Sequence, residues 1–137
     1  MSEKANFKAW REMLGILQKD IAEEMGVNIL SVKKWENPDY KQCPPERAWE
    51  ILERAQKTQE QLIEESCKIV GGHKAIQMNY FRDQAMYDEY GRDKGSVCIA
   101  NANVRAAAQV LVSRGVKVEF SYPVDKDNIY HEKRNKK

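Results

Sequence analysis

The first forty residues carry short apolar stripes at helical spacing. The first stripe predicts a helix over residues 6–14 that ends at Gly15, with apolar side chains at Phe7, Trp10, Met13 and Leu14. The second predicts a helix from residue 18 to Gly26, with one face formed by Ile21, Ala22 and Met25. Both helices are short, because a glycine ends each within about three turns.

A third short helix is predicted over residues 29–36. Asn28 can accept an amide hydrogen bond at its first turn, and Val32 and Trp35 point inward. The stretch NPDYKQCPP that follows combines Asn-Pro with Pro-Pro and predicts a loop. A long helix then begins near Pro45 and continues to Val70, about 39 Å at 1.5 Å per residue.

Beyond Gly71 and Gly72 the pattern changes to mixed strands and helices. Alternation around Ile76, Met78 and Tyr80 predicts a strand. The remaining elements expected are a helix over 83–90, a short apolar stretch over 97–100, a helix over 103–114 and a strand over 116–122.

The expected fold class is therefore mainly α, with a small α+β part. We expect an N-terminal helix-turn-helix bundle at 1–43, a long linking helix at 44–72, an α+β dimerisation segment at 73–124 and a basic disordered tail at 125–137.

Composition fits a soluble protein of the cytoplasm. The apolar fraction is 42%, and no run approaches the roughly 18 apolar residues of a membrane span. Net charge is only +2, but residues 1–72 carry −2 and residues 73–137 carry +4, much of it in the tail. The three cysteines, of which Cys43 is expected to be the most exposed, show no spacing typical of metal ligands or a disulfide framework, so no cofactor or metal is expected.

Residues 17–37 have the spacing of a helix-turn-helix unit. Ala22 is small where two helices cross, Gly26 supplies the positive φ of a tight turn, and Val27, Val32 and Trp35 are expected in the core. A unit of this kind presents its second helix to solvent, and that helix fits the DNA major groove.

This window resembles the helix-turn-helix family of the phage Cro and CI repressors, also called the XRE family. The resemblance covers Phe7 to about Asn37 and includes Gln18, Ala22, Gly26 and Glu36. It implies a sequence-specific regulator of transcription that binds double-stranded DNA. It also implies that Gln18 binds a phosphate through its amide and that Arg11 and Glu36 form a buried ion pair.

Base reading, carried over position by position, falls to the third helix. Besides the capping Asn28, the residues implied are Ile29, Leu30, Ser31, Lys33 and Lys34. Ile29 and Leu30 replace polar residues common in the family and could face either a thymine methyl group or the protein core. Tyr40 and Lys41, in the following loop, are candidates for backbone contact.

Each of these residues also has an ordinary structural interpretation. Lys33 and Lys34 could be solvated charge, and Arg11 with Glu36 could be a surface pair worth under about 1 kcal/mol. The three tryptophans, Trp10, Trp35 and Trp49, are expected in the core.

One short helix makes few contacts with DNA, so readers of this kind pair on half-sites about 34 Å apart. We expect a homodimer, held in part by the final strand, whose Val116, Val118, Phe120 and Tyr122 share a face and need a partner edge. The order of elements is similar to that of anti-CRISPR-associated phage repressors, which implies a repressor of its own operon that binds an inverted repeat.

Other functions are weighed against this one. Catalysis is not expected, because His73 and His131 have no partner at a recognisable spacing, and carboxylates such as Asp83 and Asp88 lie on a polar helix. An antitoxin whose second half blocks a toxin, and an RNA-binding regulator that uses the tail KRNKK, remain open alternatives.

Overall fold

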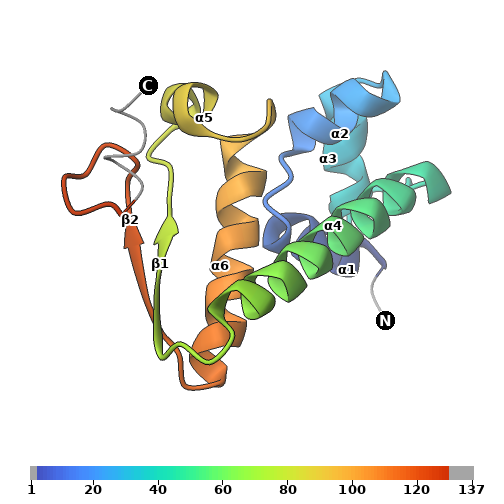
Figure 1. Cartoon of the computed structure of the whole chain (residues 1–137). Coiled ribbons are helices and arrows are strands. Elements are labelled where there is room, and N and C mark those ends of the chain that lie inside the picture. Colours follow the sequence, from blue (N-terminus) through green and yellow to red (C-terminus); the bar gives the residue numbers. More distant parts are fainter. Residues whose placement is uncertain (1–2, 130–137) are drawn as a thin grey trace. The chain divides into compact units, whose positions relative to one another are not determined.

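The computed structural model describes residues 3–129, which form six helices and two strands (Figure 1). Contacts divide the chain into two compact units between Glu60 and Gln61. We call the described residues up to Glu60 the N-terminal unit and those from Gln61 the C-terminal unit. The boundary falls inside the long helix, and each unit is described by itself.

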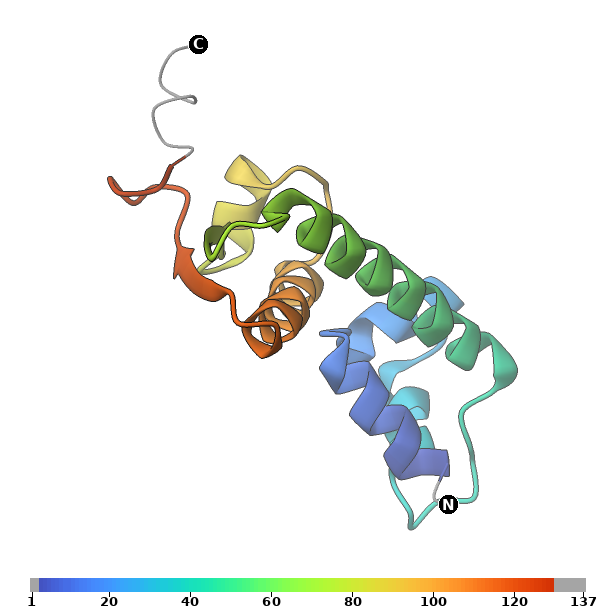
Figure 2. The ribbon, with the colours of Figure 1, turned by 60° about the horizontal axis from the view of Figure 1, so that its bottom comes forward.

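The N-terminal unit contains α1 (Glu3–Met13), α2 (Gln18–Met25), α3 (Ile29–Glu36) and the first part of α4 (Glu46–Val70), which pack together in Figure 2. The predicted helices are confirmed, with α1 beginning three residues earlier than expected. The Phe7 ring is fully buried and meets the rings of Trp35 and Trp49 edge to face, with centroids 6.5 and 5.2 Å apart. Around it lie Leu14, Ile21, Val32, Ala48 and Leu52, all buried.

Two residues predicted in this core, Trp10 and Val27, are instead at the surface, and so is Met13 from the apolar stripe of the first helix. Trp10 and Val27 are each 36% exposed, and Met13 is 54% exposed. A helical period gives the direction of Trp10 and Met13 on α1 but not whether another element covers them. Val27 lies between α2 and α3 and belongs to neither helix.

The C-terminal unit is built on two short parallel strands, β1 (Ala75–Asn79) and β2 (Lys117–Ser121). Their register runs from Ala75 opposite Lys117 to Asn79 opposite Ser121. Parallel strands need a long crossover, which here consists of α5 (Gln84–Tyr90) and α6 (Val97–Ser113). The partner edge that β2 requires is therefore supplied, on one side, by β1 of the same chain.

Helix α6 is a single helix, contrary to the prediction of a separate apolar stretch at 97–100 and a helix only from 103. It begins at its cap Ser96, whose hydroxyl accepts from the Ile99 amide at 3.4 Å. Asn101 and Ala102, which lay between the two predicted segments, are therefore part of the helix. The buried Asn101 amide donates to the Phe81 carbonyl at 2.8 Å, and its side-chain oxygen accepts from the Phe81 amide at 3.1 Å.

Residues 125–129 lie against the polar face of the sheet near the ends of both strands. Asn128 is only 4% exposed, and its Nδ2 donates to Asn79 Oδ1, Ser121 Oγ and the Tyr122 carbonyl at 2.7–3.1 Å. The Gln77 side chain donates to the Asp127 carbonyl and accepts from the Ile129 amide. The predicted disordered tail from 125 is therefore wrong for residues 125–129, and the remainder, 130–137, lies outside the described residues.

Within residues 3–129, none of the helices has the combination of length and apolar character that crossing a bilayer requires. Cys43 is exposed, as predicted, whereas Cys67 and Cys98 are half-buried, and all three are free thiols.

Candidate nucleic-acid interface

Helices α2 and α3 are joined by a tight turn at Gly26. This glycine has φ of 65°, and its amide caps α2 by donating to the carbonyls of Ala22 and Glu23. Asn28 then caps α3, because its Oδ1 accepts from the Leu30 amide at 2.9 Å. The roles predicted for Gly26 as the turn and Asn28 as a cap are confirmed.

The two faces of α3 differ sharply in exposure. Val32 is fully buried and Trp35 is 7% exposed, whereas Ile29 is 36% and Leu30 is 58% exposed. The alternative that Ile29 and Leu30 face the core is therefore excluded. At 100° per residue, Ile29, Lys33, Leu30 and Lys34 occupy one continuous arc, and half-buried Ser31 lies at its edge. We call these four residues the outer arc of α3.

The loop after α3 brings a second predicted group to this arc. The Lys34 ammonium lies 5.5 Å from the centroid of the Tyr40 ring, a cation–π geometry. The loop is shaped by Asn37, whose carbonyl accepts from the Tyr40 amide and whose side chain accepts from the Asp39 amide. Tyr40 is 44% exposed and Lys41 is exposed. The loop that follows α3 therefore returns alongside the helix at Tyr40.

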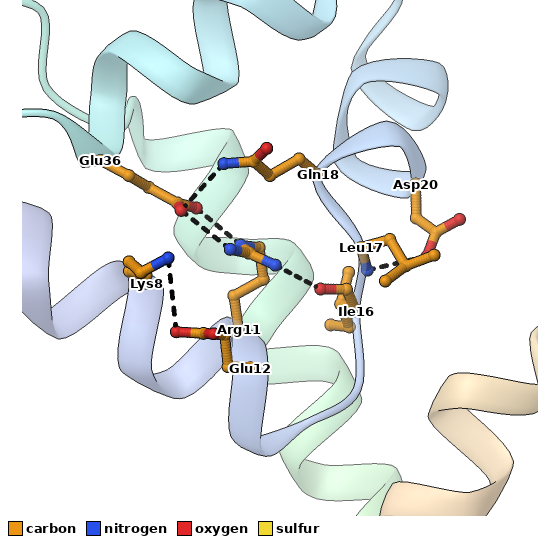
Figure 3. A network of polar contacts seen from close by, with 8 residues as sticks. All are labelled: Lys8, Arg11, Glu12, Ile16, Leu17, Gln18, Asp20 and Glu36. Atoms are coloured by element: carbon orange, nitrogen blue, oxygen red, sulfur yellow. Dashed lines mark hydrogen bonds and ion pairs between the residues drawn. The ribbon is translucent and has the colours of Figure 1, made fainter.

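A buried ion pair joins α1 to the end of α3 (Figure 3). Arg11 Nε lies 2.6 Å from Glu36 Oε2, and Arg11 Nη2 lies 2.8 Å from Glu36 Oε1. The side chains are 8% and 4% exposed, so the surface-pair interpretation is excluded. Arg11 Nη1 also donates to the Ile16 carbonyl at 2.8 Å. The Arg11 guanidinium thus connects three parts of the unit: α1, the linker between α1 and α2, and the end of α3.

Gln18 is a member of the same network. Its Nε2 donates to Glu36 Oε1 at 3.1 Å, so one of its two amide hydrogens is engaged within the protein (Figure 3). The neighbouring Leu17 amide donates to Asp20 Oδ2 at 2.9 Å. The Gln18 side chain is thereby fixed at the start of α2, where a helix carries partial positive charge. Its second amide hydrogen is the one that could meet a phosphate.

Lys4 was not expected to matter from the sequence. Its ammonium donates to the carbonyls of Lys34 at 2.8 Å and Trp35 at 3.4 Å, and also to the carbonyl of Gln42. The positive charge of Lys4 stabilises the C-terminal end of α3, which carries partial negative charge, and the bond to Gln42 links this end to the loop that carries Tyr40. No local signal could have indicated this, because the partners lie 30 to 38 residues away.

The predicted dimerisation residues lie in the C-terminal unit. Val116 and Val118 are half-buried, whereas Phe120 is 49% and Tyr122 is 37% exposed. The Phe120 ring meets the Tyr80 ring edge to face at 5.7 Å. Within the described residues the sheet has only two strands, so the outer edge of β2 has no strand beside it.

No protein-family model and no curated protein matches this chain.

The tail KRNKK and His131 lie outside the described residues.

Proposed function

We propose that this protein is a sequence-specific DNA-binding regulator of transcription of the XRE helix-turn-helix type that acts in the cytoplasm. The observation that carries the proposal is the outer arc of α3. It combines two exposed aliphatic side chains with two lysines on a helix that is capped, anchored at both ends and open to solvent on one side.

The chemistry of the arc suits base edges in the major groove. Lysine can donate to guanine O6 and N7, and an exposed aliphatic side chain can contact a thymine methyl group. Gln18, Tyr40 and Lys41 are placed by the same unit and would contact the phosphate backbone, which fixes the position of a reader without specifying sequence.

We further propose that two copies bind together on an inverted repeat, as a repressor of their own promoter. Eight residues of α3 make few base contacts, and pairing on half-sites about 34 Å apart would double them. The partly exposed Phe120 and Tyr122, beside the unpaired edge of β2, are the proposed contact between copies.

Selection from a pool of random duplexes, using the full chain, tests the proposal. We expect enrichment of a palindrome, and footprinting of the DNA upstream of the gene should protect the same sequence. Lys34→Ala should reduce binding to the selected duplex, while Lys57→Ala, an exposed lysine on α4, should not. No enrichment over unselected duplex, or stronger competition by structured RNA than by the selected DNA, would overturn the proposal.

The pairing is tested separately by sedimentation. Phe120→Glu should shift the protein toward monomer and weaken binding to the palindrome more than to a half-site. Ile69→Glu, which changes a side chain 71% exposed on α4, is the matched control and should leave the dimer intact. A monomeric wild type, or a monomer from the Ile69 variant alone, would contradict the proposed contact.

A further inference from the structure

The C-terminal unit has a hollow of about 370 Å³ at the end where both strands begin. It is lined by the turns that follow α4 and α6, which meet beside the starts of β1 and β2 (Figure 1). Its volume is within the roughly 300–1,000 Å³ range of small-molecule sites. The lining residues that bear on its chemistry are Cys67, Gly72, His73, Lys74, Arg114 and Gly115.

The parallel topology explains why these residues meet. Parallel strands begin at the same edge of a sheet, so the residues before β1 and those before β2 lie next to each other. The Lys117 amide donates to the Lys74 carbonyl at 2.8 Å, which fixes the two approaches to the strands. Segments some forty residues apart therefore contribute to one wall.

The charged side chains that line the hollow, Lys74 and Arg114, are both positive. His73, Lys74 and Arg114 are exposed, and none of the described residues that line the hollow is a carboxylate. Lys117, at the start of β2, does not line the hollow and is paired with Glu119 at 3.2 Å. Arg114 is held in place, because its Nη1 lies 3.2 Å from Cys67 Sγ. An arginine fork beside a lysine is the combination that binds phosphate oxygens, by paired donors and by point charge.

The glycines keep the wall open. A Cβ added at Gly72 or at Gly115 would meet no heavy atom within 4 Å, so both face free space. Gly115 also has φ of 86°, which allows the sharp turn from α6 into β2. A ligand can therefore approach the main chain here without displacing side chains.

From this geometry we infer that the hollow is a binding site for a phosphate group, independent of the outer arc of α3. The phosphate would belong either to a small phosphorylated ligand or to a nucleic-acid backbone. The competing explanation is that Lys74 and Arg114 only neutralise the negative ends of α4 and α6, which also lie here.

Pyrophosphate is the probe that separates these explanations. In the full chain, titration with pyrophosphate at constant ionic strength should shift the backbone amide signals of Gly71, Gly72 and Gly115 and raise the melting temperature. The double variant Lys74→Gln/Arg114→Gln should bind pyrophosphate with an affinity at least about tenfold lower than that of the wild type. The matched control Arg92→Gln/Lys94→Gln removes the same charge from an exposed loop and should bind it as the wild type does.

A short single-stranded oligonucleotide serves as the second arm. Tighter binding of the oligonucleotide than of pyrophosphate, lost in the same double variant, would assign the phosphate to nucleic acid, and the reverse would assign it to a small ligand. Equal loss in both double variants, or no shift of the glycine signals in the wild type, would overturn the inference. If the wild-type glycine signals do not shift and the Lys74/Arg114 double variant is less stable, the helix-end explanation holds. None of these outcomes depends on whether α3 binds DNA.

Discussion

Arg11 and Glu36 share two short hydrogen bonds while their side chains are almost completely withdrawn from water. Removing either partner leaves the other charge buried without compensation, which costs about 3–5 kcal/mol. We therefore expect Arg11→Met and Glu36→Leu each to lower the free energy of unfolding in urea by this amount. The double variant should lose less than the sum of the two. A loss below about 1 kcal/mol in the single variants would mean that the pair behaves as an exposed one.

The turn between α2 and α3 gives a second prediction. Gly26→Ala should destabilise the protein by about 1–2 kcal/mol, because a Cβ disfavours the left-handed conformation that Gly26 adopts at φ of 65°. An added Cβ meets no atom within 4 Å there, so the effect isolates backbone strain. Gly95→Ala, also in open space but without a positive φ, is the control and should change the urea midpoint little. Equal effects at both positions would show that strain at the turn is not the cause.

On the proposed function, Lys34→Ala should weaken binding to the selected duplex by about 1–3 kcal/mol and binding to random duplex by less. The measurement is competition binding at fixed salt. Lys57→Ala, which removes an exposed lysine from α4, is the control and should bind both duplexes as the wild type does. Equal losses on both duplexes would assign Lys34 to the phosphate backbone and not to a base.

Gln18→Ala should act differently and weaken all duplexes alike, because we propose that its amide binds the phosphate backbone. This variant also removes the hydrogen bond to Glu36 Oε1, so its melting temperature must be measured beside its affinity. Gln18→Glu is the informative companion, since it would bring a carboxylate to the phosphate and to Glu36. A change of sequence preference in Gln18→Ala would contradict the backbone role.

Asp83 predicts a dependence of stability on pH. As the cap of α5, its carboxylate accepts from the Met86 amide, and this bond lowers its pKa below the ordinary value of 3.8, with a smaller opposing contribution from burial and a further lowering by Arg82. A carboxyl group whose folded pKa is depressed stabilises the fold above its unfolded pKa, and that contribution is lost as pH falls through the folded value. The stability advantage of the wild type over Asp83→Asn, measured by urea unfolding, should therefore shrink as the pH falls through the ordinary pKa of 3.8 and then through the lower folded value. An advantage that does not change with pH would contradict this.

The sequence predicted features whose signal is local. Gly26 and Asn28 lie within a few residues of the groups they cap, so their roles follow from residue type and position. The long helix α4 was predicted for the same reason, because nothing interrupts its period before Gly71. The mainly helical class with a small α+β part is likewise confirmed.

The features that were missed depend on residues distant in sequence. Lys4 donates to carbonyls 30 and more residues away, and Asn101, which lay between two predicted segments, pairs with Phe81 twenty residues away. The exposure of Trp10 was missed for a related reason: a helical period gives the direction of a side chain but not whether another element covers it.

Residues 127–129 are bound to the sheet in two ways: two of them through main-chain atoms and one through its side chain. The hydrogen bonds of the Gln77 side chain go to main-chain atoms of Asp127 and Ile129, which are both exposed, whereas Asn128 uses its own side-chain amide. Saturation mutagenesis should consequently find one position that rejects nearly every replacement between two that accept most of them, even though all three belong to a short stretch without helix or strand.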